Sequence, residues 1–142
     1  MYLNILREVD VENLVKNIDL KYILRCILKL SITDVTIYHT LLNNNGNDPL
    51  TVSEISAVVK KSRSTVEKSL MKLIQLGLVA RRAVLTRRGG YTYVYYALPI
   101  DHVKQRLLQL VNSYYDIARE LIESTTSSVM IKSIEESSLS GE

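Results

Sequence analysis

Nine of the 18 basic residues fall within 29 positions, and the only acid among them is Glu67. The nine are Lys60, Lys61, Arg63, Lys68, Lys72, Arg81, Arg82, Arg87 and Arg88. This basic stretch carries +8, whereas the other 113 residues have 9 basic and 14 acidic side chains, or −5. A cationic segment on an acidic body is typical of a protein that binds nucleic-acid phosphates. A solvated basic surface has the same composition, so charge alone leaves both interpretations open.

The first half of the basic stretch predicts a helix from Arg63 to about Leu76, capped by Ser62 or Ser64 and ended by Gly77. Four apolar residues share one face and are predicted to enter the core: Val66, Leu70, Leu73 and Ile74. On the other face, arginine can pair with guanine, while hydroxyl and ammonium groups bind base edges or phosphates. The predicted DNA-reading residues are therefore Arg63, Ser64, Thr65, Lys68, Ser69 and Lys72. Glu67 could accept from a cytosine amino group, but a capping box with Ser64 is favoured.

The second half predicts a β-hairpin, with strands at 78–86 and 91–98 around an Arg-Arg-Gly-Gly turn. A ribbon with a basic tip suits insertion into, or alongside, a minor groove. The predicted wing residues are Arg81, Arg82, Arg87, Arg88, Gly89 and Gly90. Adjacent strand residues point to opposite faces, so at most one of Arg81 and Arg82 needs to face DNA. For the four tyrosines of the second strand, cross-strand packing is favoured over a base-stacking platform.

Two helices are predicted before the basic stretch. One runs from Thr33 to Asn43, with Thr33 or Asp34 as its cap, and a loop rich in asparagine follows it. The other begins at the capping box Thr51-Val-Ser-Glu54 and ends at Lys60. The order helix, helix, turn, helix, ribbon is that of a winged helix-turn-helix, so the fold class is mainly α with a β-hairpin wing.

The chain divides into four predicted parts. Residues 1–31 are apolar and helical, with Asp10 and Asp19 as candidate caps, and their burial on several sides suggests a place at a dimer interface. Residues 32–99 form the winged-helix domain and residues 100–124 a long helix. Residues 125–142 are a Ser/Thr-rich tail, with the last eight or so expected to be mobile.

The long helix has a heptad pattern. Its apolar residues are spaced alternately three and four apart, which predicts a helix-helix dimer seam rather than packing on its own domain. The seam residues are Ile100, Val103, Leu107, Leu110, Tyr114, Ile117 and Leu121.

The sequence gives little support for an enzyme, a metal-binding protein, a disulfide-bonded protein or a membrane protein. The two histidines, His39 and His102, lie in no metal motif, and no Gly-rich phosphate loop or Gly-x-Ser-x-Gly is present, so we expect no enzyme, metal or cofactor. Cys26 cannot form an internal disulfide. The longest stretch without a charge has 13 residues, short of the ~20 that cross a membrane, and the N-terminus does not read as a signal peptide. We therefore expect a cytoplasmic protein that does not enter membranes.

Several segments carry a family resemblance: Leu50-Thr-Val-Ser-Glu-Ile55, Ser62-Arg-Ser-Thr-Val66 and Leu73-Ile-Gln-Leu-Gly-Leu-Val79. Over about residues 25–122 the chain resembles archaeal TrmB-like winged-helix regulators, with MarR-like proteins close behind. The resemblance implies a homodimer that binds pseudo-palindromic operators, often through a C-terminal helix. It departs from full-length TrmB regulators in having no large C-terminal sugar-binding domain.

The sequence thus predicts a homodimeric regulator that binds double-stranded DNA sequence-specifically. The alternative is a winged helix used for protein-protein contact within a transcription complex, although such modules usually lack a basic recognition helix and wing. The operator, the sign of regulation and any small-molecule effector are left open by the residues.

Overall fold

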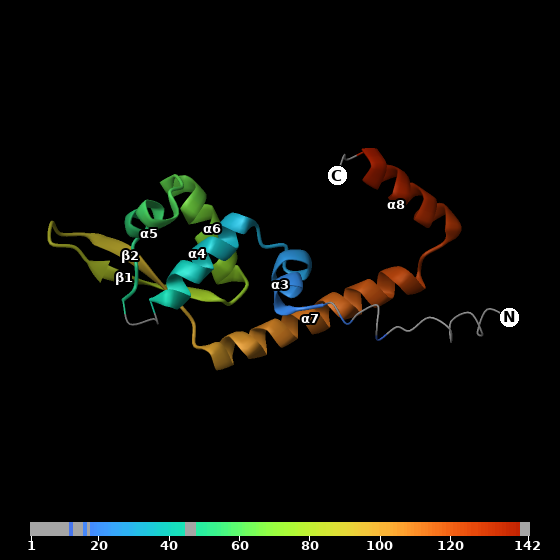
Figure 1. The fold of residues 1–142 in the computed structure, drawn as a ribbon, viewed down its shortest axis with the longest axis horizontal. Coiled ribbons are helices and arrows are strands. Elements are labelled where there is room, and N and C mark those ends of the chain that lie inside the picture. Colours follow the sequence, from blue (N-terminus) through green and yellow to red (C-terminus); the bar gives the residue numbers. More distant parts are fainter. Residues whose placement is uncertain (1–11, 13–15, 17, 45–47, 140–142) are drawn as a thin grey trace. The chain divides into compact units, whose positions relative to one another are not determined.

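The computed structural model describes residues 12, 16, 18–44 and 48–139. The chain separates into two compact units, Met1–Arg106 and Leu107–Glu142. The described elements follow in the order α3 (Leu20–Tyr22), η1 (Ile23–Ile27), α4 (Ile32–Asn43), α5 (Val52–Val59), α6 (Arg63–Gln75), β1 (Val79–Leu85), β2 (Tyr91–Ala97), α7 (Ile100–Glu123) and α8 (Ser127–Leu139) (Figure 1). The predicted fold class, mainly α with one antiparallel hairpin, is confirmed.

Local capping signals set the starts of the three central helices. Thr51 and Glu54 form the predicted capping box of α5, and the Ser62 hydroxyl accepts from the Thr65 N–H at the start of α6. The predicted cap of α4 was wrong, because Ser31 takes that position and forms a capping box with Asp34. A serine three residues before an aspartate satisfies two helix-end donors at once, which a cap at Thr33 would leave open.

The segment before α4 is short and irregular. Asp19 caps α3 as predicted, whereas Asp10 lies outside the described residues. The helix widens at once into the π-helical turn η1, closed by the bond from the Leu28 N–H to the Ile23 carbonyl. Lys29, at φ 56°, ends it in the left-handed conformation.

The core of the first unit draws side chains from every element between η1 and the start of α7. Ile37, Ile55, Val66, Leu70, Leu73 and Leu78 are completely buried. Tyr95 of β2 is also buried, and its backbone pairs with Leu50 ahead of α5. This bridge fixes the base of the hairpin to the helices.

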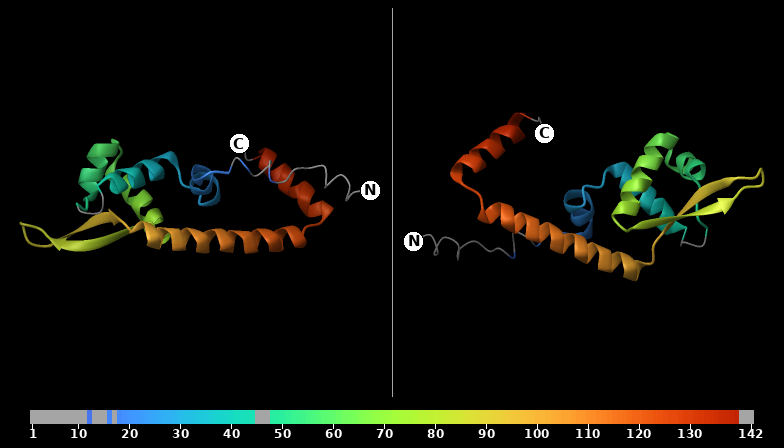
Figure 2. Two further views of the ribbon diagram at one scale, coloured as in Figure 1. Left: turned by 60° about the horizontal axis from the view of Figure 1, so that its bottom comes forward. Right: turned by 180° about the vertical axis from the view of Figure 1, so that it is seen from behind.

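The hairpin pairs Val79 with Ala97 at its base and Leu85 with Tyr91 near its tip. Its outer part projects beyond α4, α5 and α6 as a two-stranded ribbon (Figure 2). The chain reverses at Gly89 and Gly90, whose φ angles of 79° and 92° disfavour residues with a Cβ. The elements thus have the arrangement of a winged helix-turn-helix.

The second unit contains the rest of α7, followed after a break at residues 124–126 by α8. The segment predicted as a Ser/Thr-rich tail, residues 125–142, thus contains a helix from Ser127 to Leu139. Most predicted seam residues of α7 are accessible: Tyr114, Ile117 and Leu121 expose 51%, 60% and 64%. Val103, by contrast, is buried in the core of the first unit, so its assignment to a dimer seam was wrong.

The apolar stripe of α7 is also wider than the predicted seam. A second row runs beside the first with the same spacing, formed by Leu108, Val111, Tyr115, Ala118 and Ile122. Leu108, Tyr115 and Ile122 are exposed. A stripe of this width is broader than a two-stranded seam requires.

No helix in the described part of the chain is long and apolar enough to cross a membrane.

Candidate nucleic-acid interface

The N-terminal turn of α6 presents polar groups to solvent. Arg63 and Lys68 are exposed, and neither side chain has a hydrogen-bond or ion-pair partner among the residues described. The Ser62 hydroxyl lies 2.9 Å from the Thr65 hydroxyl and 3.3 Å from that of Ser64. Because Ser62 is the cap, the predicted capping box of Ser64 with Glu67 was wrong, and Glu67 is simply exposed. The helix dipole and free N–H groups at this end favour a phosphate.

Two residues predicted on the outer face of α6 instead face α4. Ser69 is only 6% exposed and donates to Asp34 Oδ1 at 2.5 Å. The Lys72 ammonium donates to Asp34 Oδ2 at 3.0 Å and also bonds to the Lys29 carbonyl. The placement of Ser69 opposite the core was therefore wrong. The Lys72 side chain stays 38% exposed, but its ammonium turns toward Asp34, because a buried carboxylate attracts both residues.

Asp34 of α4 consequently links this helix to α6 through its side-chain contacts. It is 4% exposed and interacts with Ser31, Ser69 and Lys72. Burial by itself raises the pKa of Asp34, but the hydrogen bonds from Ser69, the Ser31 backbone and Lys72 outweigh it, so the pKa lies below its ordinary value. The carboxylate therefore stays charged at neutral pH and holds α6 at a fixed angle to α4.

The C-terminal end of α6 is held by the first turns of α7. Arg106 Nε donates to the Leu76 carbonyl at 3.1 Å, and Nη2 donates to the Gln75 carbonyl at 3.2 Å. These are carbonyls that a helix end leaves without partners. The predicted terminator Gly77, at φ 80°, passes directly beneath this side chain, since a Cβ there would lie 2.6 Å from Arg106 Cγ. The middle and the C-terminal end of α6 are thus held by side chains from other helices, Asp34 and Arg106.

The base of the wing joins the outer face of α6. The Arg81 guanidinium stacks on the ring of Tyr93 at 4.0 Å from its centroid, and Nη1 lies 3.9 Å from the Met71 sulfur of α6. Arg82 pairs with Val94 and so points to the opposite face of the ribbon. Arg81 is therefore the member of this pair that lies on the side of α6.

The tip of the wing presents two further cations. Arg87 and Arg88 are exposed and have no side-chain partner among the described residues. Thr86 closes the turn, with its N–H donating to the Gly90 carbonyl at 2.9 Å and its hydroxyl to the Gly89 carbonyl at 3.1 Å. The turn is held by its own hydrogen bonds, which leaves both guanidinium groups free for a ligand.

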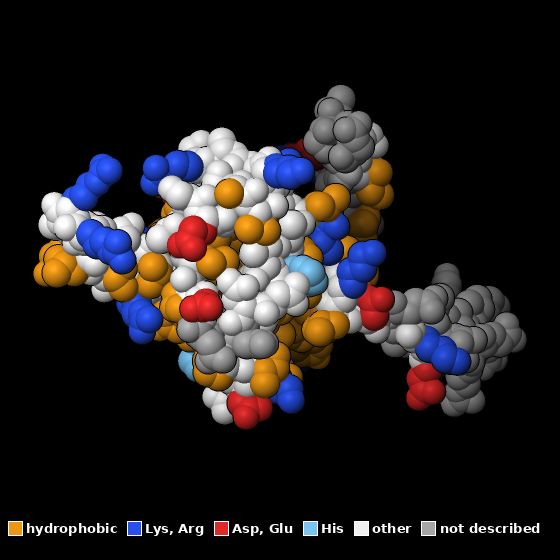
Figure 3. Space-filling view, turned by 60° about the vertical axis from the view of Figure 1, so that its left-hand side comes forward, with side chains coloured by type: hydrophobic (Ala, Val, Ile, Leu, Met, Phe, Trp, Pro, Cys, Tyr) orange, Lys and Arg blue, Asp and Glu red, His pale blue; other side chains and the backbone are white. Residues whose placement is uncertain are grey.

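Seen with the wing toward the viewer, Lys and Arg side chains gather over the wing and along the neighbouring helices (Figure 3). The basic stretch of the sequence thus becomes a basic surface, which extends from α6 to the wing tip. Among the residues that the structure describes, no group of three His, Cys, Asp or Glu side chains could hold a metal ion.

Comparison with known proteins identifies this arrangement. The family model "Sugar-specific transcriptional regulator TrmB" matches residues 24–101, more than half of the chain. The chain belongs to the TrmB family of transcriptional regulators. The match runs from η1 through the wing to the start of α7, so it contains every element of the basic surface.

Three archaeal proteins are similar to this TrmB-family chain. An uncharacterized protein of Methanocaldococcus jannaschii is 36% identical over 72% of this chain and 82% of its own length. The crystal structure of the ST1889 protein of Sulfolobus tokodaii has a TM-score of 0.54 at 30% identity, and covers 69% of this chain and 93% of that one. A possible transcriptional regulator from Methanosarcina mazei has the same fold, with a TM-score of 0.63 at 24% identity over 77% and 91% of the two chains.

The sequence analysis did not identify two residues that position α6 in this TrmB-family chain. Asp34 was considered only as a helix cap, and Arg106 was not singled out. The signal for Asp34 was its place three residues after Ser31, which predicts a capping box but not the contacts with Ser69 and Lys72. Arg106 has no local signal, since its partners are backbone carbonyls 30 and 31 residues away.

Proposed function

We propose that this chain binds double-stranded DNA sequence-specifically, as a homodimer, and regulates transcription without enzymatic activity. The N-terminal face of α6 reads base edges in the major groove through Arg63, Ser64, Thr65 and Lys68. The wing contacts the backbone and adjacent minor groove through Arg81, Arg87 and Arg88. Ser69 and Lys72 position α6 instead of touching DNA.

The observation that carries this proposal is a set of cations without partners. Seven basic side chains of one stretch form no hydrogen bond or ion pair with any described residue: Lys60, Lys61, Arg63, Lys68, Arg82, Arg87 and Arg88. Unpaired cations that repel one another lower stability, so they are explained best by an anionic partner that neutralises them. Phosphates spaced along a duplex supply such a partner.

The homodimer is supported by the apolar stripe of α7. The proposed seam consists of the predicted residues that stay accessible: Ile100, Leu107, Leu110, Tyr114, Ile117 and Leu121. Two recognition helices related by a two-fold axis would enter successive major grooves about 34–36 Å apart.

The experiment is a salt titration of binding to two duplexes, one selected from a randomised library and one random. The logarithm of the affinity for both should fall steeply with the logarithm of salt concentration, with a slope near −0.9 per phosphate contacted. The selected duplex should bind more tightly at every salt concentration. Absence of binding at low salt would overturn the proposal and favour a winged helix that contacts proteins.

Matched variants test the division between reading and anchoring. Arg63→Ala should cost about 1–3 kcal/mol at one base position and relax specificity there. Arg88→Ala should weaken binding to all duplexes alike and reduce the salt slope by about 1. Lys104→Ala, an exposed cation of α7 outside the basic surface, is the control and should leave selectivity unchanged. Equal, sequence-independent losses from Arg63→Ala and Arg88→Ala would contradict the assignment.

A further inference from the structure

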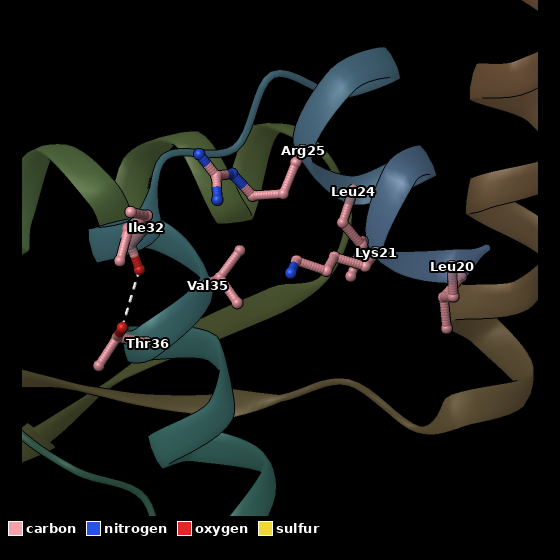
Figure 4. A pocket seen from close by; sticks show the side chains of 7 residues that line it. All are labelled: Leu20, Lys21, Leu24, Arg25, Ile32, Val35 and Thr36. Atoms are coloured by element: carbon pink, nitrogen blue, oxygen red, sulfur yellow. Dashed lines mark hydrogen bonds between the residues drawn. The ribbon is translucent and has the colours of Figure 1, made fainter. Parts of the chain in front are cut away.

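A pocket lies between the first helical turns and α4, away from the basic surface of α6 and the wing. Its volume is about 310 Å³, near the lower end of the range of about 300–1,000 Å³ for small-molecule sites. Leu20, Leu24, Ile32 and Val35 supply aliphatic walls, and the hydroxyl of Thr36 is turned to the Ile32 carbonyl at 2.8 Å (Figure 4). Leu20 and Ile32 remain 60% and 68% exposed, so the pocket is an accessible apolar surface.

Two cations share this pocket. The Lys21 side chain extends from α3 toward Val35, and the Arg25 guanidinium extends from η1 over the side of Ile32 (Figure 4). Among the residues described, the Lys21 ammonium has no hydrogen-bond or ion-pair partner, and Arg25 bonds only through Nε, to the Leu30 carbonyl at 2.8 Å. The lining contains no acidic residue. Apolar walls with uncompensated positive charge complement a ligand that has an apolar body and an anionic head.

We propose that this pocket binds a small aliphatic carboxylate and that occupancy is transmitted to the recognition helix α6. The carboxylate pairs with Lys21 and Arg25, and the alkyl chain covers Leu20, Leu24 and Ile32. Apart from the two cations and Thr36, whose hydroxyl is turned to the Ile32 carbonyl, the lining is aliphatic, which suits an alkyl chain rather than a polar body such as a sugar.

A continuous set of contacts connects the pocket to α6. Arg25 holds the Leu30 carbonyl, and the adjoining Lys29 carbonyl accepts from Lys72 of α6. Ser31 follows, and its capping partner Asp34 binds Ser69 and Lys72. Residues 29–31 are therefore held from one side by a pocket residue and from the other by the recognition helix.

A bound carboxylate competes for this set of contacts. In the side-on pairing a carboxylate takes the Arg25 Nε–H together with one Nη–H, so it competes with the Leu30 carbonyl for Nε. A charge-assisted bond is about twice as strong as one to a neutral carbonyl, so the ligand displaces Leu30 from Nε. The turn that accepts Lys72 is then released, and α6 loses part of its alignment. The ligand should therefore weaken DNA binding, and DNA should weaken ligand binding by the same factor.

The first experiment needs no DNA and so does not depend on the proposed function. Octanoate is titrated into the full chain while backbone amide resonances are followed by NMR. We expect saturable shifts at Leu24 and Val35, together with shifts at Ser69 and Lys72 on α6. Octan-1-ol, with the same chain and no charge, should bind at least tenfold more weakly.

Matched variants decide whether the pocket is responsible. Lys21→Met removes a cation that supports nothing else among the described residues, and should weaken octanoate about tenfold, a typical effect of losing one charge-assisted bond. Lys104→Met makes the same change outside the pocket and should have no effect. Equal binding by the Lys21→Met variant, or shifts confined to the exposed apolar residues Tyr114 and Leu121, would overturn the site.

The second experiment rests on the proposed function. Octanoate at saturation should weaken binding to the selected duplex about fivefold or more, at the lower end of ordinary allosteric coupling, and the Lys21→Met variant should need proportionally more octanoate. Pocket shifts without shifts at Ser69 and Lys72, or an unchanged DNA affinity, would overturn the transmission. If the chain binds no duplex at all, the proposed function fails, while the NMR titration still decides the pocket and its connection to α6.

Discussion

Val66, Leu70 and Leu73 of α6 are completely buried, whereas Tyr114, Ile117 and Leu121 of α7 expose 51–64% of their surface. Both helices carry apolar side chains at helical spacing, but only α6 finds its complement within its own unit. Burying one such side chain contributes about 1.5–3 kcal/mol, so the winged-helix unit accounts for its own stability. The exposed stripe of α7 offers the same contribution only to a partner.

The two regions also differ in charge. The winged-helix unit holds the whole basic stretch, and seven of the nine cations of that stretch have no side-chain partner among the described residues, which suits its surface to bind an anion. The stripe of α7 is apolar and is suited to pack against another apolar surface. One region is thus completed by DNA and the other by a second copy of the chain, in the function proposed above.

The largest expected effect comes from charging the α7 stripe. Ile117→Lys together with Leu121→Lys should raise the dimer dissociation constant at least about ten-thousandfold, because the dimer loses the burial of four side chains at about 1.5–3 kcal/mol each. Light scattering should show a monomer. Gln105→Lys with Asn112→Lys, on the polar side of α7, is the control and should stay dimeric. A doubly charged stripe that leaves the dimer intact would place the interface elsewhere, with residues 1–31 as the next candidate.

The contrast between buried and exposed side chains can be measured in that monomeric background. There, Leu70→Ala should lower the free energy of unfolding by about 2–5 kcal/mol, because it leaves a cavity in the core. Tyr114→Ala should change it by less than about 0.5 kcal/mol, since its side chain touches little in the monomer. Urea denaturation gives both values. Comparable losses would mean that α7 packs on its own chain.

The stability that Asp34 contributes by linking α4 to α6 should depend on pH. Asp34→Asn leaves Ser69 and Lys72 without their charged partner and should destabilise the chain by about 1–3 kcal/mol at pH 7. The folded pKa of Asp34 is lowered, so its contribution is fully present above the unfolded value of about 3.9 and is lost as the pH falls through the folded pKa. Melting temperatures of the wild type and the variant should therefore converge as the pH falls below the unfolded value of about 3.9. A constant difference between them would exclude Asp34 as the titrating group.

The smallest expected difference, about 1 kcal/mol, separates alanine substitutions at two glycines, one of them at the end of α6. Gly77 and Gly89 have nearly equal φ angles, 80° and 79°, but only at Gly77 would a Cβ meet a neighbour, Arg106. Alanine should cost about 1–2 kcal/mol at either position for the left-handed backbone. Gly77→Ala should cost about 1 kcal/mol more, because it displaces the Arg106 bonds to Gln75 and Leu76. Equal losses in thermal unfolding would show that the Arg106 cap contributes little.

Local signals made much of the fold predictable. Thr51 and Glu54 lie three residues apart, Gly77 follows its helix directly, and the two strands flank a Gly-Gly turn, so each element could be placed from its own residues. The recognition helix and the wing were found in the same way, because their basic residues lie within 29 positions. The family match supports the fold that these signals indicated.

Pattern alone failed where two elements compete for one side chain. Val103 fits the heptad of α7 perfectly, yet it enters the core of the first unit. Ser69 and Lys72 fit the polar face of α6, yet Asp34 draws both toward α4. A helical projection shows which residues share a face, but not which neighbouring helix will cover part of it.

The sequence by itself determined the order of the elements from α4 to α7, the capping box of α5 and the concentration of positive charge, since these depend on residues within a few positions of one another. Only the tertiary structure decided which polar residues support α6 and which remain free. The contacts of Asp34 with Ser69 and Lys72 span 35 and 38 residues, and that of Arg106 with Leu76 spans 30. Such contacts depend on the angle at which helices cross, which is set by the packing of the whole core.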